Sequence, residues 1–310
     1  MQDADATEAI AKAIDLNPNS IFILDLPLAD VELLSAKFAD NENVMMLNVR
    51  HSEDELRAEK CSAAVFHTIA SASMLTDAMA QYLVFMNWRK VLVLTSDLGR
   101  DKSTGSTFLA SAKKFGLTVV DERQFINSND PRQREKNEPR LLTGGADYDV
   151  IFLADDEGEF GRYLAYSTYL PRPVVGTEGL IASSWHWTWE RNGAPQLNQR
   201  IRKIAKRNPS AESWAAWAAI KSVVEAAIKT GSTTPSHLAQ ALRSVEFSVD
   251  LYKVGAGSYR PWDQQLRQAI LLHTHNAVVG TAPFDGFLHQ TSTFDTLGFD
   301  QPEKRCTLSR

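Results

Sequence analysis

The sequence predicts an α/β fold with parallel, doubly wound sheets and two domains. Short apolar runs alternate with helical patterns along most of the 310 residues, and this βαβα order is typical of parallel sheets. The runs are apolar on consecutive residues, as in strands that are covered on both faces. The predicted strands span residues 21–26, 44–49, 64–68, 91–95, 117–120, 149–154 and 173–176.

Three helices between and after these strands have clear signals. Residues 74–86 carry an apolar stripe at helical spacing, and residues 106–116 end in two lysines and a glycine, which is typical of a helix C-terminus. The longest predicted helix, 211–230, is capped by Ser210 and closed by Gly231. Trp214, Trp217, Val224 and Ile228 line one side of it, and the two tryptophans are expected to be core residues.

Other segments depart from this alternation. Residues 127–140 are polar and are predicted to form an exposed loop. After residue 240 the pattern changes to a turn followed by strands. The last thirty residues show little periodicity, and we expect them to wrap over the surface.

Composition and charge exclude several classes of protein. Hydrophobic residues make up 44% and charged residues 23% of the chain, which is typical of a globular protein and excludes collagen and coiled coil. The net charge of −5 argues against a nucleic-acid-binding protein, which would carry a basic face. The longest apolar runs are too short to cross a bilayer, and the first ten residues lack the features of a signal peptide.

The two cysteines, Cys61 and Cys306, leave two possibilities open. They are either separate reduced thiols or partners in a long-range disulfide, which would imply an oxidising compartment. No CxxC pair occurs, and this excludes a zinc ribbon or a thioredoxin-type centre.

Motifs for catalysis and nucleotide binding are missing from the sequence. No GxGxxG follows a strand, and no Walker, GxSxG, HExxH or EF-hand pattern occurs. His273 and His275 have no carboxylate or cysteine nearby in sequence, and His67 is expected to be a hydrogen-bonded structural residue. The sequence therefore predicts a protein that is not an enzyme and requires no cofactor.

Polar side chains gather instead where predicted strands end, which is where open α/β sheets bind ligands. Ser71 and Ser73 stand at the N-terminus of the 74–86 helix, where free N–H groups and hydroxyls favour carboxylates. Asp97 follows the fourth predicted strand, and Glu178 lies between two glycines. Each also has a plain structural interpretation, as a helix cap, a turn former or a solvated loop residue.

The sixth predicted strand runs directly into four carboxylates. Glu157 and Glu159 are expected in the first turn of the next helix, where negative side chains interact favourably with the helix dipole. Asp155 and Asp156 would lie across from Glu178, which follows the next strand of the same sheet. Three acids together favour a cation with oxygen ligands or an amine-bearing solute, and the alternative is a set of turn-forming residues.

In their order along the chain, these segments resemble type I periplasmic solute-binding proteins of the branched-chain amino-acid kind. "HTIASASMLTDAMAQYL" is similar to the family's Ser/Thr strand end and following helix, and "VLVLTSDLGRDKSTGSTFLASAKKFG" to its second-lobe strand and helix. "GTEG", which contains Glu178, resembles a loop whose glutamate binds the ligand ammonium in amino-acid binders. The resemblance covers about residues 20–280 and implies two α/β lobes joined by three crossovers, with the ligand held between them.

A narrower resemblance is carried by "YRPWDQQLRQAILL", "GFLHQTSTFDTLG" and "FGRYLAYSTYLPRPVVGTEGL". These strings are similar to the substrate-binding protein of ABC transporters associated with PQQ-dependent alcohol dehydrogenases in lanthanide-utilisation gene clusters. The resemblance implies a periplasmic monomer that delivers a small solute or metal to an ABC permease in the inner membrane. It also implies a disulfide between Cys61 and Cys306, because cysteines stand at both positions in that subfamily.

The resemblance further implies a division into lobes. Residues 1–87 and 211–240 would form lobe 1, residues 88–210 and 241–280 would form lobe 2, and residues 281–310 would pack back on lobe 1. The family's first strand, first helix and second strand have no counterpart before "IFILDL", so lobe 1 is expected to lack its first βαβ segment.

The expected ligand-binding residues are Ser71, Ser73, Asp97, Asp155, Asp156, Glu178 and Trp185. Three of them, Asp155, Asp156 and Glu178, are the expected ligands of a lanthanide or calcium ion. Trp185 and Trp187 are expected to stack on a ligand if that ligand is an aromatic solute such as a quinone. A metal chelate is a further possible ligand, and a sensor or protein-interaction module with a degenerate cleft is the alternative to a transport protein.

Overall fold

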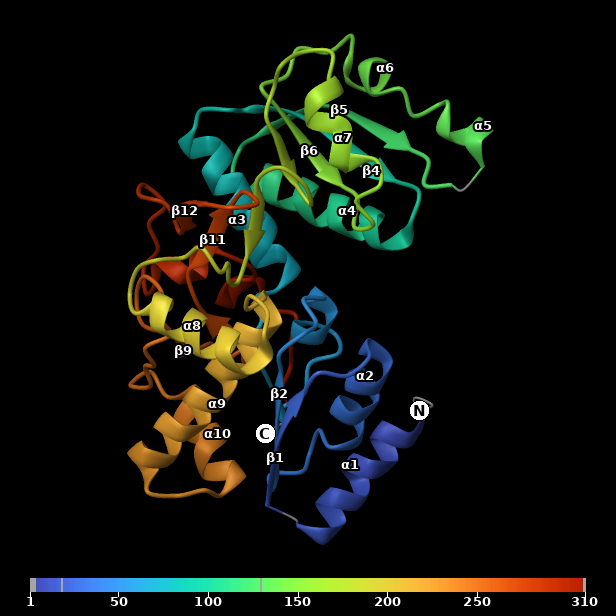
Figure 1. Cartoon of the computed structure of the whole chain (residues 1–310). Coiled ribbons are helices and arrows are strands. Elements are labelled where there is room, and N and C mark those ends of the chain that lie inside the picture. Colours follow the sequence, from blue (N-terminus) through green and yellow to red (C-terminus); the bar gives the residue numbers. More distant parts are fainter. Residues whose placement is uncertain (1–3, 18, 129, 309–310) are drawn as a thin grey trace. The chain divides into compact units, whose positions relative to one another are not determined.

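The computed structural model describes residues 4–17, 19–128 and 130–308. The chain divides into two compact units (Figure 1). Unit 1 contains the chain up to Ser71, then Ser184–Ala269 and the segment from Phe299, and unit 2 contains Ala72–Ser183 and Ile270–Gly298. Each unit has a parallel sheet with helices, which confirms the predicted fold class.

The parallel sheet of unit 1 has the strand order β1-β2-β3. Its strands are β1 (Ser20–Leu24), β2 (Val44–Asn48) and β3 (Val65–His67). Every residue of β2 is buried, as expected for a central strand that is covered on both faces. Helices α1 (Ala4–Leu16) and α2 (Leu28–Lys37) contribute to the same hydrophobic core as these strands.

Further helices and short strands complete unit 1. They are α8 (Ala194–Ala205), α9 (Ala211–Thr230), α10 (Pro235–Arg243), η1 (Asp54–Arg57), η3 (Gln301–Glu303), β9 (Ser258–Tyr259) and β10 (Leu266–Arg267).

Helix α9 has the predicted bounds and caps. Ser210 accepts a hydrogen bond from the Ser213 N–H at 3.4 Å, and Gly231 adopts the left-handed conformation that ends the helix. Trp214 is a core residue, as expected, whereas Val224 and Ile228 on the same predicted side have exposed fractions of 48% and 73%. The helix packs through Trp214 together with small residues, namely Ala215, Ala218, Ala219, Ser222 and Ala226, and these allow a closer approach than branched side chains do.

Glutamine side chains complete the hydrogen bonding along the β3 edge of the unit 1 sheet. Gln264 Nε2 donates to the carbonyls of Ser62, at 2.8 Å, and Val65. Gln268 Nε2 donates to the carbonyl of Thr68 at 2.8 Å. The main chain of this segment also forms a parallel bridge to His67 through Gln265. The string "RPWDQQLRQ" thus supplies a partner for an edge strand.

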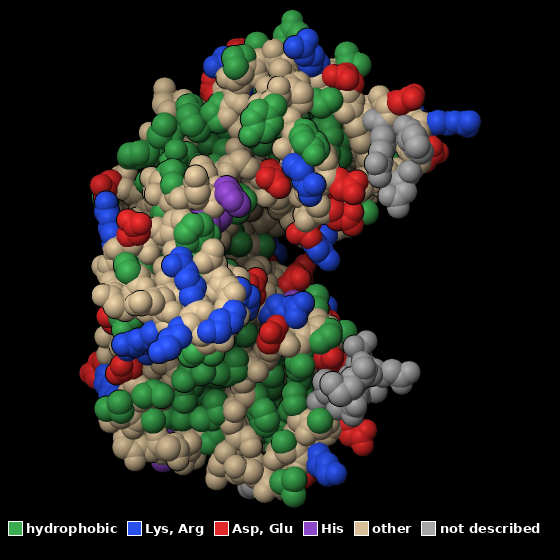
Figure 2. Space-filling model, in the orientation of Figure 1, with side chains coloured by type: hydrophobic (Ala, Val, Ile, Leu, Met, Phe, Trp, Pro, Cys, Tyr) green, Lys and Arg blue, Asp and Glu red, His purple; other side chains and the backbone are tan. Residues whose placement is uncertain are grey.

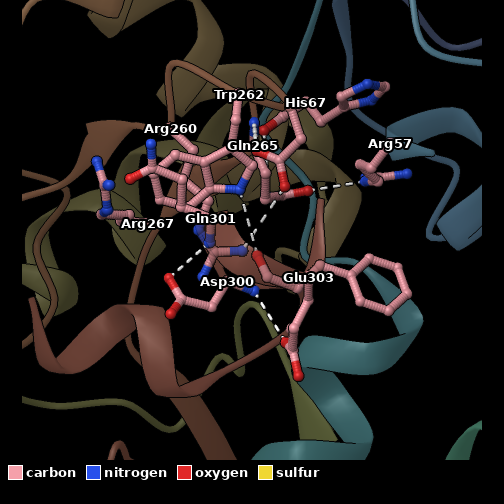
Figure 3. Close-up of polar contacts among 12 residues, drawn as sticks. Arg57, His67, Arg260, Trp262, Gln265, Arg267, Asp300, Gln301 and Glu303 are labelled. Carbon is pink, nitrogen blue, oxygen red and sulfur yellow. Dashed lines mark hydrogen bonds and ion pairs between the residues drawn. The ribbon is translucent and has the colours of Figure 1, made fainter. Parts of the chain in front are cut away.

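Gln265 connects β3 to a buried arginine, as Figure 3 shows. Its Nε2 donates to the carbonyl of Ile69 at 2.9 Å, and its Oε1 accepts from Arg57 Nε at 2.8 Å. Arg57 is 2% exposed, and burial lowers the pKa of its guanidinium to about 10. Its other nitrogens donate to main-chain carbonyls, which compensates for part of the cost of burying the charge.

His67 is buried at the end of β3. Its Nδ1 lies 3.1 Å from Asn48 Nδ2, which donates to it. Burial, together with the positive charge of Arg57, holds the pKa of His67 well below its usual range. The prediction of a hydrogen-bonded structural histidine is confirmed.

A disulfide joins Cys61 to Cys306, 245 positions apart in the sequence. The predicted pairing is confirmed. It attaches the C-terminal segment to the chain just before β3, within unit 1. Closing so long a loop stabilises a fold by roughly 5 kcal/mol in the chain-entropy model.

The parallel sheet of unit 2 has the strand order β5-β4-β6-β7. Its strands are β4 (Lys90–Ser96), β5 (Thr118–Phe125), β6 (Val150–Ala154) and β7 (Val174–Gly176). The accompanying helices are α3 (Ala72–Phe85), α4 (Gly99–Lys114), α5 (Pro131–Arg134), α6 (Pro139–Thr143) and α7 (Gly161–Ser167). All seven strands predicted between residues 21 and 176 are present in the two sheets.

Unit 2 also contains an antiparallel sheet with the order β12-β11-β8. Its elements, with the short helix that follows them, are β8 (Ile181–Ser183), β11 (Ile270–His273), β12 (Val278–Ala282) and η2 (Thr293–Thr296).

Two local predictions need correction. The polar stretch 127–140 was expected to be a loop, but it includes α5 and the start of α6, which Glu138 caps by accepting the Arg140 N–H. Glu157 and Glu159 were expected in a first helical turn, but α7 begins only at Gly161. The hydrogen-bonded turn before α7 delays the start of that helix.

The compact units also divide the chain at places other than those predicted. Helix α3 was expected in lobe 1 but lies in unit 2, where its Thr76 hydroxyl is 2.8 Å from that of Ser111 in α4. Residues 184–210 and 241–269, expected in lobe 2, lie in unit 1. The segment 281–310 was expected to pack on lobe 1, but only its part from Phe299 onwards belongs to unit 1. The part up to Gly298 belongs to unit 2, where the Gly298 N–H donates to Asp77 of α3 at 2.8 Å.

Among the described helices, none combines the length and apolar character needed to cross a membrane.

Candidate functional site

The carboxylate of Asp155 organises the turn that joins β6 to α7. The residue is 2% exposed. Its Oδ1 accepts the N–H of Gly158 at 3.1 Å, and its Oδ2 accepts those of Phe160 at 3.0 Å and Gly161 at 2.7 Å. Hydrogen bonds to charged acceptors are stronger than neutral ones. Asp155 therefore explains why a buried strand runs into an acidic stretch: its charge holds the turn together.

A second buried carboxylate, Asp101, links the ends of two neighbouring strands. It lies in the first turn of α4 and accepts a hydrogen bond from the Ser96 hydroxyl at the end of β4. It also accepts the Asp156 N–H, at 2.9 Å, just after β6. Ser96 in turn accepts the Leu98 N–H at 3.0 Å. These contacts fix the carboxyl ends of β4 and β6 against each other.

Asp156 differs from Asp155 because its side chain points towards solvent. It forms an ion pair with Arg100, and the exposed fractions of the two side chains are 46% and 75%. An ion pair this exposed contributes little to stability, since water and salt screen it. Acidic and basic side chains are intermixed on the visible face of unit 2 in Figure 2, so the negative charge of this region is partly balanced.

Glu178 lies on the loop after β7 and packs against the same turn. The Gly161 position has no room for a larger residue: a Cβ there would lie 2.9 Å from Glu178 Cγ and 3.3 Å from Asp155 Oδ2. Between them, Thr177 accepts the Asp155 N–H at 2.9 Å. The structure thus brings Asp155 and Glu178 together, as predicted, and the Glu178 carboxylate makes no hydrogen bond or ion pair within the described part of the chain.

A small cavity of about 180 Å³ lies beside the acidic turn. Its lining includes Asn127, Glu159 and Phe160. Asn127 ties the cavity to the predicted site, because its N–H donates to Asp97 at 3.0 Å and its Nδ2 donates to Glu157 at 2.9 Å. Ligand pockets usually enclose about 300–1,000 Å³, so this cavity has room for only a small chemical group.

The two predicted serines stand at the start of α3, as expected. Ser71 precedes the first helical residue, and Ser73 is the second residue of the helix. Both side chains are buried. Ser71 belongs to unit 1 and Ser73 to unit 2.

Trp185 requires a correction, because it is a core residue of unit 1. It is 2% exposed, stacks on Trp214 with ring centroids 5.8 Å apart, and donates its indole N–H to Asn198 at 3.0 Å. Both its aromatic face and its polar atom are therefore engaged within the fold. The expected stacking surface for a quinone is not available on this side chain.

The predicted metal ligands lack the geometry of a metal site. Within the described residues, no group of three or more His, Cys, Asp or Glu side chains could hold a metal ion. The reason is local: main-chain N–H groups occupy the Asp155 oxygens, and Arg100 pairs with Asp156. Hard cations such as calcium require six to eight oxygen ligands, and of the three predicted ligands only Glu178 keeps a carboxylate without a partner among the described residues.

Two residues of this region were not predicted, Thr177 and Arg100. Thr177 had a usable signal, since it stands beside Glu178 in the same strand-end loop. Arg100 had none, because its partner Asp156 lies 56 positions away and the pair forms only when β4 and β6 are neighbours.

Comparisons with known proteins agree with this fold. A family model described as "Periplasmic binding protein" matches residues 2–133. A branched-chain amino-acid ABC transporter periplasmic ligand-binding protein from Burkholderia xenovorans has a TM-score of 0.77 at 12% identity, with 99% of this chain and 86% of that chain covered. The chain has the fold of type I periplasmic binding proteins.

Two further type I periplasmic binding proteins show the range of ligands on this fold. A leucine-, isoleucine-, valine-, threonine- and alanine-binding protein from Brucella ovis has a TM-score of 0.76 at 17% identity, covering 100% of this chain and 86% of its own. A Rhodopseudomonas palustris solute-binding protein in complex with benzoate has a TM-score of 0.70 at 13% identity, covering 99% and 86%. A search of curated proteins gives no match.

Proposed function

We propose that this chain is the periplasmic solute-binding component of an ABC transporter, a non-enzymatic, monomeric protein that delivers a small solute to a permease in the inner membrane. The observation that carries the proposal is the fold: nearly the whole chain aligns with solute-binding proteins of such transporters. The match of residues 2–133 to a periplasmic binding protein family supports it independently. Because fold alone does not fix a ligand, the ligand class has to come from the site.

The acidic turn of unit 2 favours a solute that carries an amine. Of its carboxylates, that of Glu178 has no hydrogen bond or ion pair within the described residues, whereas Asp155 and Asp101 are occupied and Asp156 is paired. A half-buried carboxylate without a protein partner suits one ammonium group, which it can bind by a charge-assisted hydrogen bond.

The transport system that the sequence strings suggest is the one linked to PQQ-dependent alcohol oxidation and lanthanide utilisation. Its ligand candidates are a lanthanide ion, its chelate and a quinone such as PQQ itself. The absence of a three-ligand group among the described residues and the burial of Trp185 make a bare ion and a quinone less well supported than an amine-bearing solute.

Calorimetric titration of the full chain separates these ligand classes. Lanthanum, calcium, PQQ and a panel of amino acids and amines would each be added to the unmodified protein and to Glu178→Gln. We expect an amine-bearing ligand to bind, and Glu178→Gln to weaken it about 10-fold or more, because a hydrogen bond to a charged group contributes roughly 1.5–3 kcal/mol. Asp156→Asn is the matched control and should change the affinity little.

Other outcomes would point elsewhere. Lanthanum binding that depends on both Asp155 and Glu178 would favour metal transport over an amine. If no ligand in the panel binds and a stable complex with another periplasmic protein forms, the sensor or interaction module replaces the transport role.

A further inference from the structure

A second cavity lies within unit 1, on elements that the acidic turn does not include. It encloses about 450 Å³, which falls in the range of small-molecule sites. Its wall combines two cationic side chains, Arg243 and Lys304, with the largely apolar surface of Pro261, Trp262, Cys306 and Leu308. None of its lining residues has an assigned role in the proposed function.

The two cations make this cavity attractive to an anion. Arg243, at the end of α10, donates from Nε to Gln264 Oε1 at 2.8 Å and from Nη2 to the Ala63 carbonyl at 2.7 Å, so its guanidinium is held in place. The Lys304 ammonium has no hydrogen bond or ion pair within residues 4–17, 19–128 and 130–308. A carboxylate that reaches Lys304 would therefore displace no protein partner.

Trp262, in the apolar part of the wall, is held in place by its neighbours. The Trp262 indole donates to the Phe299 carbonyl at 3.3 Å, and the guanidinium groups of Arg260 and Arg267 lie 5.6 and 5.1 Å from its ring centroid. Figure 3 shows Trp262 beside Arg260 and Arg267. A side chain fixed in this way gives a preformed surface, which lowers the entropic cost of binding an apolar ligand body.

A neighbouring cavity limits where the anion can bind. It shares Arg243 and Ala63 with the first, but its wall also contains Asp40 and Glu42. Like charges repel an anionic ligand from that side. The favourable position lies on the side of Lys304, against the C-terminal segment.

The disulfide holds the wall that carries Lys304. Residues 304, 306, 307 and 308 all line the cavity, and Cys306 is bonded to Cys61. No strand or helix contains the chain beyond η3 in the described residues, so the disulfide is its covalent anchor. Integrity of the cavity is therefore coupled to the oxidised state of this cysteine pair.

We propose that this cavity binds a small organic carboxylate with an apolar body, and that it does so only while the Cys61–Cys306 disulfide is intact. The carboxylate pairs with Lys304 and Arg243, and the apolar body packs on Trp262, Pro261 and Leu308. This site is separate from the Glu178 region and independent of the proposed transport function.

Titration calorimetry of the full, oxidised chain with benzoate as the probe tests the site. We expect benzoate to bind and the uncharged analogue benzamide to bind more weakly. Lys304→Gln should reduce the benzoate affinity about 5-fold, as expected for the loss of one partly exposed charge pair. Reduction of the disulfide should abolish binding.

Control variants test whether benzoate binds at this cavity and not elsewhere on the protein. Lys203→Gln removes an exposed lysine from α8 of the same unit and should leave the affinity unchanged. Glu178→Gln should leave benzoate binding unchanged even if it abolishes binding of an amine, so the two proposals fail independently. Circular dichroism shows whether the reduced protein is still folded. If it is unfolded, the effect of Lys304→Gln on benzoate affinity alone tests the proposal.

The proposal is overturned if about 10 mM benzoate gives no binding, or if Lys304→Gln and Lys203→Gln bind it equally. It is also overturned if the reduced, folded protein binds benzoate as well as the oxidised one, or if Glu178→Gln removes the binding.

Discussion

The two parallel sheets of the molecule are supported in different ways. In unit 2, β6 is paired with β4 on one side and β7 on the other through main-chain hydrogen bonds. In unit 1, β3 is paired with β2 on one side, while its other side is bonded largely to the side chains of Gln264, Gln265 and Gln268. An unpaired strand edge leaves N–H and C=O groups unsatisfied, and unit 1 satisfies the carbonyls with amide side chains.

The side chains that form hydrogen bonds to the main chain also differ in charge between the two units. In unit 1 neutral amides donate to carbonyls around β3, and the cations bonded to these amides include Arg243 and the buried Arg57. In unit 2 a buried carboxylate, Asp155, accepts three N–H groups. Single substitutions should therefore damage unit 1 by leaving one nitrogen of a buried cation without its acceptor, and unit 2 by leaving a turn without its charged cap.

The largest effect is expected from Gln265→Leu. The substitution removes the acceptor of Arg57 Nε and one of the two donors to the Ile69 carbonyl, and both groups are buried. We expect the free energy of unfolding to fall by about 3 kcal/mol, because an unsatisfied buried group costs roughly 1–3 kcal/mol and more when it is charged. Urea unfolding followed by tryptophan fluorescence measures it, since Trp88 alone among the seven tryptophans lies outside unit 1.

Gln196→Leu, at an exposed position of α8, is the control for Gln265→Leu. Equal stabilities of these two variants would contradict the role assigned to the glutamine segment.

A smaller effect is expected from Asp155→Ala in unit 2. The variant leaves three main-chain N–H groups of one turn without an acceptor, but part of that turn can reach water. We expect a loss of about 2 kcal/mol in the free energy of unfolding. Asp156→Ala removes only the exposed pair with Arg100 and should cost less than about 0.5 kcal/mol. If the two variants were equally stable, the division of roles between the adjacent aspartates would be wrong.

The smallest effect is a pH dependence that arises from His67. The pKa of His67 is held well below 6.5 in the folded state, so the unfolded chain binds more protons between these two pKa values. Stability is therefore complete above about pH 6.5 and is lost as the pH falls below it, at no more than about 1.4 kcal/mol per pH unit. Urea midpoints at several pH values below 7 measure the slope, and His67→Asn should flatten it.

His273 in unit 2 provides an internal comparison for that slope. Burial also lowers its pKa, so it contributes with the same sign. His273→Asn should therefore leave part of the pH dependence of stability in place. If the pH dependence vanished in His273→Asn but not in His67→Asn, it would arise from unit 2 instead of unit 1.

Much of the secondary structure could be predicted from local sequence patterns. The seven predicted strands from residue 21 to residue 176, the bounds of the 211–230 helix and its Ser210 and Gly231 caps all agree with the structure. These features depend on neighbours in the sequence: apolar runs, capping residues and a glycine that accepts a positive φ. Which side chains of the same helix are exposed could not be predicted in this way, because exposure depends on the elements that pack against the helix.

The candidate site was predictable in part. The proximity of Asp155 and Glu178 could be predicted because each follows a strand, and β6 and β7 are neighbours in one parallel sheet. What each carboxylate contacts was not predictable from that position. The N–H groups that occupy Asp155 come from the fold of its turn, and the cation that pairs with Asp156 comes from another strand end.

The sequence by itself determined the α/β alternation, the polar strand ends and, through the resemblance it carries, the pairing of Cys61 with Cys306. Tertiary structure alone decided which polar groups are already satisfied: Trp185 is buried on Trp214, Asp155 is taken up by its own turn, and "RPWDQQLRQ" is used to complete β3. The physical reason is the separation in sequence between the residues that interact. Backbone conformation and capping follow from residues a few positions apart, whereas burial and hydrogen-bond satisfaction depend on groups that folding brings together from distant parts of the chain.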